Sequence, residues 1–267
     1  MSAAYIRQRH LDNRGVSDAA PTPLVPADYY RAIADVDQRH WWHRGMREIA
    51  RALLGDRLAA GGLRLLDVGC GTGGFLDWIR EFAQQAAVAG VDVSEEAVGI
   101  AQERMPGVDL RVAAASRLPF ADSSFDLVVL NDVLQHIPED LVHDSLLELR
   151  RVLAAEGALL VRTNAARRAW RSSPDWRLYD AQSLRQELES AGLTCERLTH
   201  ANVVGSLWGA ATGHRPAPPS ATSHGVPSAG SSRADAVKLR LLLLEAGYLA
   251  RRGAALPYGH TLFALAS

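Results

Sequence analysis

Residues 63–76 have the sequence Leu-Arg-Leu-Leu-Asp-Val-Gly-Cys-Gly-Thr-Gly-Gly-Phe-Leu, an apolar run that breaks into four glycines within six positions. The run is typical of a buried parallel strand, and Phe75, Leu76, Trp78 and Ile79 have the spacing of the apolar stripe of a helix. A strand, a glycine turn and a helix bring backbone close to a ligand and point a helix N-terminus at it. The alternative is a turn that needs its glycines for positive φ alone.

The composition of the whole chain limits the class of protein to which this stretch can belong. A chain of 267 residues, 48% apolar and 22% charged, is typical of an ordinary soluble protein with one large domain or a domain with additions. The net charge of −1 gives no bulk attraction to nucleic acid or anionic lipid, so neither partner is predicted. Two cysteines, Cys70 and Cys195, cannot form a disulfide framework, and the polar N-terminus lacks a secretory h-region. These features predict a cytoplasmic protein.

The N-terminal part divides into two predicted units. Residues 1–26 are polar and carry three prolines, which predicts a mobile leader. Residues 27–60 form a predicted helical cap, with helices over 27–38 and 41–59 that end at two glycines. Its aromatic and histidine cluster, Arg39-His40-Trp41-Trp42-His43, is either a lid over a pocket or a core anchor where the cap docks, and both can hold for different residues.

From residue 61 onward the pattern alternates strands and helices. Strands are predicted at 63–68, 87–93, 109–113, 125–130, 158–164, 193–201 and 261–266, with helices at 73–85, from 95, 139–153, 181–191 and 234–252. Alternation of this kind predicts an α/β fold: a doubly wound, seven-stranded, mostly parallel sheet with an antiparallel last strand. Within this domain, 61–267, residues 213–233 are rich in Pro, Gly and Ser and predict a flexible excursion. The basic segment with Trp170 and Trp176 is predicted either to line a pocket for an acceptor substrate or to be a solvated crossover. The second interpretation is favoured.

The glycine loop is compatible with two cofactors. Gly69, Gly71 and Gly74 satisfy the dinucleotide fingerprint, and Asp92 follows near the spacing of a ribose-binding acid. Asp67, however, stands two residues before the first glycine, where a carboxylate repels a pyrophosphate and attracts a cationic amino group. This favours S-adenosylmethionine, and the predicted antiparallel last pair of strands agrees.

The downstream segments carry a resemblance. Gly-Val-Asp-Val-Ser at 90–94, Leu-Pro-Phe at 118–120 and Phe-Asp-Leu-Val-Val at 125–129 follow the glycine loop in order. With this series the chain resembles the class I S-adenosylmethionine-dependent methyltransferases, in the broad group that acts on small molecules. The resemblance is strong over about 61–165 and loose over 180–200 and 258–267, and the Trp-Trp-His-Arg entry at 41–44 is similar to a preface in part of that group.

The resemblance implies a cofactor site. Asp67, Gly69 and Gly71, with Cys70 as a small residue in the turn, would hold the methionine part, Asp92 would accept both ribose hydroxyls, and Val93 would pack on the adenine. Asn131, at the tip of the fourth predicted strand, would lie near the sulfonium. The sequence departs from the family at one point: positions 113–116 read Ala-Ala-Ala-Ser, where an acid usually binds the adenine amino group. Either Ser116 replaces it, or backbone and water do.

Candidate catalytic residues follow from the chemistry. A sulfonium is an activated methyl donor, so the protein mainly aligns the acceptor and, for a hydroxyl or an acidic carbon, removes a proton. His136 lies one turn past Asp132 near a strand tip, and His40 and His43 lie in the predicted cap; each is a candidate base, although a histidine at 136 also commonly bonds backbone. The histidines show no metal-ligand spacing, so no metal is predicted.

Three functions therefore remain open. The first is methyl transfer to a small-molecule acceptor, such as one of specialised metabolism, held under an aromatic lid. The second is an NAD(P)-dependent oxidoreductase, which rests on the glycines and Asp92. The third is a member that binds S-adenosylmethionine without transferring methyl, which the missing acid suggests.

Overall fold

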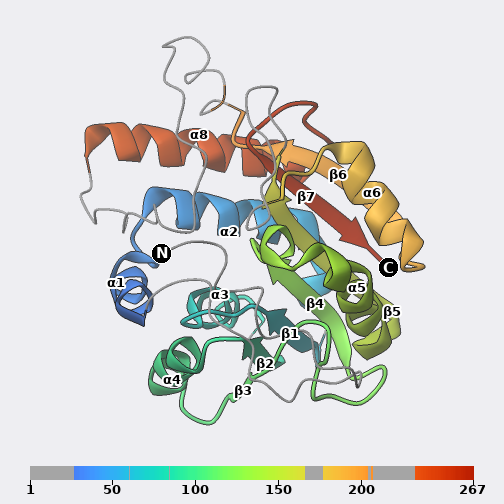
Figure 1. The fold of residues 1–267 in the computed structure, drawn as a ribbon. Coiled ribbons are helices and arrows are strands. Elements are labelled where there is room, and N and C mark those ends of the chain that lie inside the picture. Colours follow the sequence, from blue (N-terminus) through green and yellow to red (C-terminus); the bar gives the residue numbers. More distant parts are fainter. Residues whose placement is uncertain (1–26, 60, 84, 166–176, 204–205, 207–231) are drawn as a thin grey trace.

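The computed structural model describes residues 27–59, 61–83, 85–165, 177–203, 206 and 232–267. A single seven-stranded sheet runs through the molecule (Figure 1). Its strands are β1 (Arg64–Val68), β2 (Ala87–Asp92), β3 (Asp109–Val112), β4 (Phe125–Asn131), β5 (Leu153–Asn164), β6 (Cys195–Ala201) and β7 (Thr261–Ala266). The α-helices are α1 (Ala27–Val36), α2 (Trp41–Leu54), α3 (Gly74–Ile79), α4 (Glu95–Arg104), α5 (Val142–Val152), α6 (Ala181–Ser190) and α8 (Arg233–Leu249). Short 3-10 turns are η3 (Gly55–Ala59), η4 (Leu134–His136) and η5 (Glu139–Leu141).

The strand order confirms the predicted fold class. Strands lie in the order β3-β2-β1-β4-β5-β7-β6. The first five are parallel, while β7 pairs antiparallel with both β5 and β6. The chain therefore winds outward in one direction from β1 and in the other from β4. In such sheets, ligands bind beyond the carboxyl ends of the strands at this reversal.

Alternation along the strands divides the core between the two faces of the sheet. Leu65, Leu127 and Leu160 face a cluster with α2, α3, α4 and α8, whereas Leu66 and Val128 face a cluster with α5 and α6. These side chains are at most 1% exposed. Parallel strands covered by helices on both sides must be apolar on both faces, which accounts for their continuous apolar runs.

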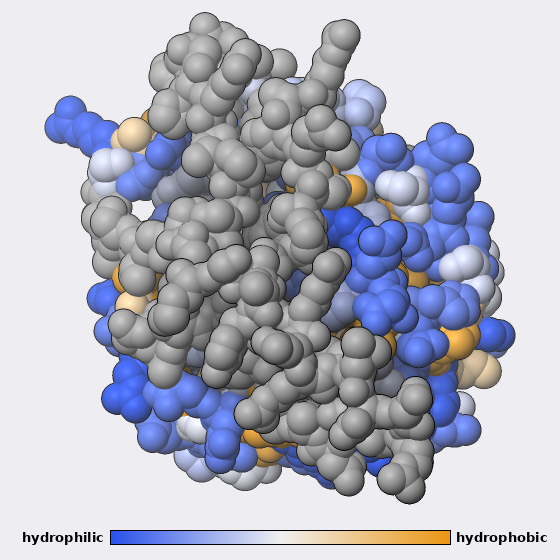
Figure 2. All heavy atoms as spheres, in the orientation of Figure 1, coloured by the Kyte–Doolittle hydropathy of each residue, from blue (hydrophilic) through white to orange (hydrophobic). Residues whose placement is uncertain are grey.

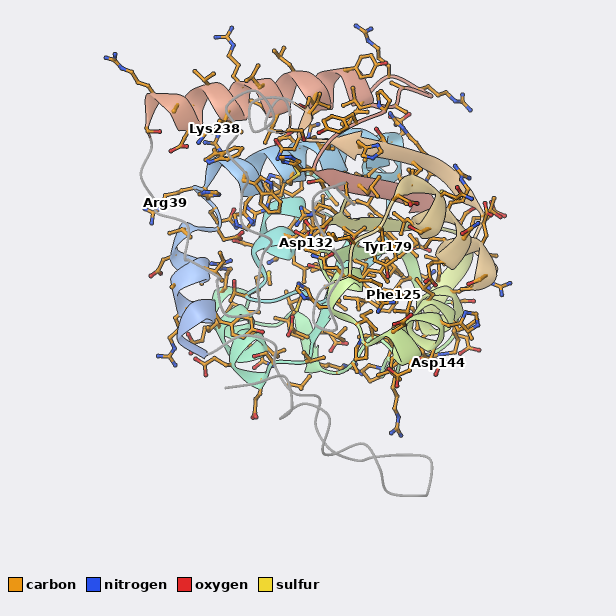
Figure 3. All side chains as sticks on the ribbon, turned by 45° about the horizontal axis from the view of Figure 1, so that its top comes forward. Arg39, Phe125, Asp132, Asp144, Tyr179 and Lys238 are labelled. Carbon is orange, nitrogen blue, oxygen red and sulfur yellow. The ribbon has the colours of Figure 1, made fainter. Side chains whose placement is uncertain are left out.

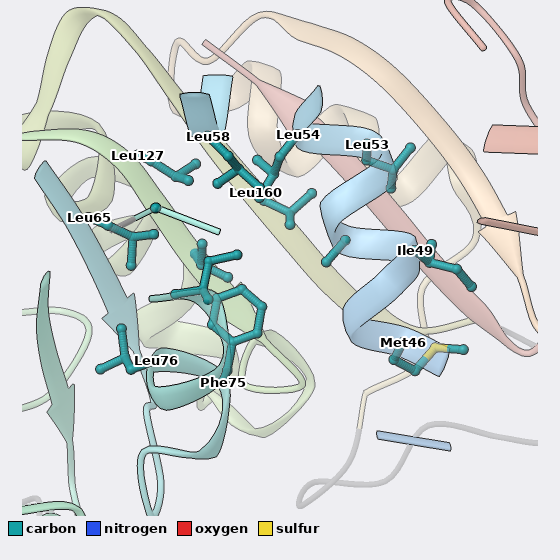
Figure 4. Close-up of a cluster of buried hydrophobic side chains, with 14 of the residues drawn as sticks. Met46, Ile49, Leu53, Leu54, Leu58, Leu65, Phe75, Leu76, Leu127 and Leu160 are labelled. Atoms are coloured by element: carbon teal, nitrogen blue, oxygen red, sulfur yellow. The ribbon is translucent and has the colours of Figure 1, made fainter. Parts of the chain in front are cut away.

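Helix α2 is part of this core. Met46, Ile49 and Leu54 are at most 1% exposed and lie in the same cluster as Leu65 and Leu160 (Figure 4). On its other side α2 runs next to α8 (Figure 1). One face of α2 thus belongs to the core, while the role of the aromatic and histidine cluster at 39–43 as lid or core anchor stays a prediction.

Several helices and strands begin or end at other residues than the sequence predicts. The helix predicted over 73–85 ends at Ile79, after which single turns continue to Ala83. The strand predicted over 158–164 begins earlier, at Leu153, because Leu153 pairs with Phe125 across a register shift. The predicted mobile leader, most of the excursion at 213–233, and Trp170 and Trp176 lie outside the described residues.

Candidate functional site

The glycine loop lies between β1 and α3 at the reversal point of the sheet. Gly69 and Gly71 have φ of 77° and 53°, a region that glycine adopts without strain. The backbone N–H groups of Gly69 and Cys70 donate to the Val91 carbonyl oxygen at 2.7 and 2.9 Å, which fixes the loop to β2. A Cβ on Gly69 would overlap Val133, whereas a Cβ on Gly71 would meet no atom within 4 Å. Gly71 therefore presents bare backbone to open space.

That space is a cavity of about 580 Å³ between the loop, the carboxyl ends of the strands and the N-terminal helices. Ten of the eleven residues singled out from the sequence line it: Asp67, Gly69, Cys70, Gly71, Asp92, Val93, Asn131, His136, His40 and His43. Ser116 is not among the lining residues; Ala113 and Ala115 from the same segment are. What binds an adenine amino group there stays a prediction.

Two polar side chains at the cavity have buried atoms without hydrogen-bond partners. Asp67 is 2% exposed, and its Oδ1 has no hydrogen-bond partner; both side-chain atoms of Asn131 are likewise unpartnered. Burial raises the pKa of Asp67 to about 7, with the nearby Arg162 opposing and Asp92 adding to the rise. Unsatisfied buried polar atoms are costly, so they indicate a complementary ligand. A cationic amino group beside Asp67 fits this pair, and the residues therefore fit S-adenosylmethionine.

Asp92 connects β2 to the glycine loop. Its carboxylate accepts hydrogen bonds from the N–H groups of Gly71 and Ser94, each at 2.9 Å. Burial raises the pKa of Asp92, and these backbone hydrogen bonds limit the rise. Since a carboxylate offers about four lone-pair positions, it can hold the loop and still accept from a ligand hydroxyl.

The N-terminal helices bring a buried charge cluster to the same cavity. Asp37 binds Arg47 through one carboxylate oxygen and lies 3.1 Å from His43 Nδ1 through the other. Gln38 joins them to the loop: its side chain accepts from Arg47 at 2.8 Å and donates to the Gly74 carbonyl at 3.1 Å. The cap and the glycine loop are thus one hydrogen-bonded unit.

His43 and His40 lie at the cap side of the cavity. Burial lowers the pKa of His43 to about 4 although Asp37 opposes this, so His43 is neutral near pH 7. Burial also lowers the pKa of His40, whose Nδ1 is buried without a partner. With Nδ1–H of His43 donated to Asp37, its Nε2 is the free acceptor, a tautomer inferred from the contacts.

An ion pair at the tips of β4 and β5 was missed from the sequence. Arg162, which is 7% exposed, binds Asp132 Oδ2 at 2.7 Å and stacks over Trp42 at 5.1 Å. Asp132 adopts a φ of 56° there, and its N–H donates to the Arg162 carbonyl at 2.8 Å. A lone arginine in the apolar run Leu159–Thr163 was the available signal, because a charge in a doubly covered strand needs a partner.

His136 lies on η4 at the same edge. It is half-buried and lines the cavity, next to Gln135, whose Oε1 accepts a hydrogen bond from Thr163 at 2.7 Å. This bond joins η4 to β5. The geometry thus brings His136, His40 and His43 to one cavity.

The described residues also bear on metal binding, the Cys70 thiol and membrane-spanning helices. Among the described residues, no group of His, Cys, Asp and Glu is arranged to hold a metal ion. Burial raises the pKa of Cys70, so the thiol stays protonated, in keeping with a small turn residue. Over the same part of the chain, none of the helices combines the length and apolarity needed to cross a bilayer.

Known proteins resemble this chain in sequence and fold. Residues 66–161 match the model of the methyltransferase domain family. A protein of Mycolicibacterium smegmatis, named a probable S-adenosylmethionine-dependent methyltransferase, is 33% identical over 149 residues, which cover 56% of this chain and 55% of that protein. The demethylmenaquinone methyltransferase of Staphylococcus aureus is 36% identical over 106 residues, covering 37% and 42%. The chain therefore spans about half the length of the first curated relatives it matches.

A solved structure has a similar fold over more of the chain. The TehB-like methyltransferase of Corynebacterium glutamicum has a TM-score of 0.52 at 18% identity, over 82% of this chain and 86% of that one. Sheet order, glycine loop and matched model together define a class I, Rossmann-like S-adenosylmethionine-dependent methyltransferase domain. Residues 66–161 thus match the methyltransferase domain family, and the first curated relatives of the chain are named as dependent on S-adenosylmethionine.

Proposed function

We propose that the protein transfers a methyl group from S-adenosylmethionine to a small-molecule acceptor bound in the cavity beneath the N-terminal cap. The observation that carries the proposal is the set of buried atoms without hydrogen-bond partners, Asp67 Oδ1 and Asn131 Oδ1 and Nδ2, beside the open backbone of Gly71. Asp67 would bind the cationic amino group and Asp92 the ribose hydroxyls, with Val93 against the adenine. The cofactor supplies an electrophilic methyl on its sulfonium.

The chain's own residues would hold and orient the acceptor. His43 lines the cavity as a neutral imidazole whose Nδ1 is fixed by Asp37, so its Nε2 can accept a hydrogen bond from an acceptor O–H or N–H. His136 and His40 line the same cavity and are the alternative bases. Trp42, held under Arg162, would cover the acceptor as part of the aromatic lid.

Relatives support the class of acceptor. Relatives of the chain include enzymes named for demethylmenaquinone methylation and for O-methylation in ubiquinone biosynthesis. A cavity of about 580 Å³ is within the usual range for small-molecule sites. A role in specialised metabolism, a cytoplasmic location and the division into cap (27–60) and methyltransferase domain (61–267) stay predictions from the sequence.

Isothermal titration tests the cofactor first. S-adenosylhomocysteine should bind at one site, and NADH should give no heat. Binding of NADH alone would favour the oxidoreductase and contradict the proposal.

Methyl transfer is tested separately with S-adenosylmethionine carrying a labelled methyl. Label should appear in a small molecule when the protein is mixed with a metabolite extract of its source, and the product gains one methyl in mass spectrometry. Label that stays in the cofactor, despite normal cofactor binding, would support a non-transferring member.

The base is identified by paired substitutions. His43→Asn should lower kcat at least tenfold while leaving the Kd for S-adenosylhomocysteine within a few-fold, since general-base contributions run from about a hundredfold upward. His136→Asn is the matched control from η4, which lines the same cavity. A loss confined to His136→Asn would move the base to η4.

A further inference from the structure

Helix α8 has a surface that the proposed methyl transfer does not use. Its buried residues Leu242, Ala246 and Leu249 face α2, and the opposite side is exposed. Figure 3 shows α8 at the edge of the molecule, with side chains that extend away from the body. Four large apolar side chains of this helix are exposed: Val237 (59%), Leu243 (43%), Leu244 (65%) and Tyr248 (42%). Such a concentration on one helix is uncommon for a surface that faces water alone.

Cations share this outward face. Arg233 and Arg240 are 7 residues apart, so they lie on the same side of the helix as Leu244, and Arg251, in the turn after α8, lies 5.9 Å from the ring centroid of the exposed Tyr248. All three are exposed, and Arg252 follows directly. We call this surface, made of these four arginines and the four apolar side chains, the outward face of α8.

The two acids of α8 are engaged elsewhere. Asp235 forms the capping box with Ser232 and pairs with Lys238 at 3.1 Å. Glu245 is 9% exposed and accepts hydrogen bonds from the N–H groups of Asn202 and Val203 at 2.7 and 3.0 Å. Apolar and cationic groups therefore share the outward face without a carboxylate from the helix itself. This combination is typical of helices that lie in the interface of an anionic membrane.

We infer that the outward face of α8 docks on an anionic lipid surface. The apolar side chains would enter the boundary between headgroups and acyl chains, and the arginines would contact lipid phosphates. A second copy of the chain is a poorer occupant, because its own arginines would oppose these. Residues 207–231 of this chain contain no Asp or Glu, so they too lack the complementary charge.

The outward face of α8 lies near the cap, so docking on lipid would affect how an acceptor reaches the cavity. Lys238 Nζ, on the second turn of α8, lies 5.0 Å from the centroid of the Trp41 ring. The neighbours of Trp41 in sequence, His40 and Trp42, line the cavity. A bilayer on the outward face would thus lie about one helix diameter, ~10 Å, from the cap side of the site, within reach of an amphiphilic acceptor that enters the cavity from the lipid.

Vesicle co-sedimentation of the full chain tests the inference. Wild-type protein should sediment with vesicles of phosphatidylcholine mixed with phosphatidylglycerol but not with phosphatidylcholine alone, and the bound fraction should fall as salt is raised. Leu244→Glu and the double variant Arg240→Glu/Arg251→Glu should each lower the partition coefficient at least tenfold, since one cation near such a surface changes it about fivefold.

Leu147→Glu is the matched control, because Leu147 is 41% exposed on α5, on the opposite face of the sheet. It should sediment like wild type, and all variants should keep the wild-type circular dichroism spectrum. The inference is overturned if wild type ignores anionic vesicles, or if Leu147→Glu loses as much binding as Leu244→Glu. It is also overturned if ultracentrifugation shows a dimer that Leu244→Glu dissociates, since a second copy then covers the face.

Discussion

At the scale of single residues, the two glycines of the loop separate folding from binding. Gly71→Val should abolish binding of S-adenosylhomocysteine, because a branched Cβ would occupy the space that the backbone leaves for the ligand. The fold should survive with a loss of about 1–3 kcal/mol, the cost of a positive φ. Titration calorimetry and thermal unfolding measure the two effects.

Gly69→Ala is the comparison for this prediction. Its Cβ would overlap Val133 at a φ of 77°, so the substitution should lower stability more than Gly71→Val does. If Gly71→Val binds the ligand normally, the cofactor lies elsewhere in the cavity.

Asp67 makes cofactor affinity depend on pH. Because the carboxyl titrates with a pKa of about 7, it is largely protonated at pH 6 and attracts a cationic amino group weakly. The affinity for S-adenosylhomocysteine should therefore rise up to about tenfold per pH unit below pH 7 and level off above it. In Asp67→Asn the affinity should be lower and independent of pH over this range, and titration calorimetry at pH 5.5, 6.5 and about 8 distinguishes the two.

The same carboxyl affects the stability of the ligand-free protein with the opposite sign. Its pKa in the folded state lies above the ordinary value of 3.8, so the unfolded state loses its proton first. This contribution to stability is full below about pH 4 and declines as the pH rises towards 7. Asp67→Asn should remove that decline, which urea unfolding across the range would reveal.

At the scale of helices and strands, the contact between α2 and α8 depends on one small residue. A Cβ on Gly45 would lie 2.7 Å from Leu242 Cβ and overlap the rest of that side chain. Gly45→Ala should thus destabilise the protein by about 1–3 kcal/mol, although alanine is the better helix former. Leu242→Ala alone should cost about 2–5 kcal/mol through its cavity.

The double variant tests the contact itself. With both changes, the overlaps with Leu242 Cγ and Cδ1 disappear and only the close contact with Cβ remains, so the loss should be smaller than the sum of the single losses. Urea unfolding of the four proteins measures the coupling. Additive losses would mean that the helices separate enough to absorb the extra carbon.

Elements with strong local patterns were predictable from the sequence, and the cap was predictable in part. The run from Leu63 to Val68 and the serine cap at Ser94 produce β1 and α4 where expected, since Ser94 Oγ accepts from the Ala97 N–H at 3.2 Å. The early start of β5 depends on pairing with Phe125, which no local pattern encodes. The different roles of the two faces of α2 could likewise be assigned only from the tertiary structure. Trp42 and Ile49 are both apolar, but Trp42 lines the cavity whereas Ile49 packs in the core.

At the scale of the whole molecule, net charge conceals local charge. A total of −1 predicted no attraction to anionic lipid, yet the outward face of α8 gathers four arginines while acids gather elsewhere, as at Glu95, Glu96 and Glu103 beside α1. In Figure 2 the coloured residues of one face are mainly hydrophilic, with hydrophobic residues exposed between them. The cofactor residues were predictable because the glycine loop is contiguous in sequence. The Asp37–His43 and Asp132–Arg162 pairs were not predictable, because the sequence contains these residues but does not indicate that they lie close together in the fold.

Binding of the cofactor should tighten the cap unevenly. Tyr30 and Ile33 of α1 line the cavity, whereas Met46 and Ile49 of α2 are fully buried before any ligand arrives. In hydrogen exchange, saturating S-adenosylhomocysteine should therefore slow the amides of α1, while those of α2, already held by the core, change little. β7 serves as the internal control, because it lies between β5 and β6 with all its side chains buried.

The comparison decides what the N-terminal helices do. Protection that rises in α1 alone, in a sample that calorimetry shows to be saturated, means that α1 closes over the site while α2 belongs to the core of the domain. Equal gains in α1 and α2 would mean that residues 27–60 move as one lid, with the buried face of α2 opening in the ligand-free protein. No gain in α1 at saturation would contradict any closure of the cap, and the aromatic cluster would then act as a fixed wall of the cavity.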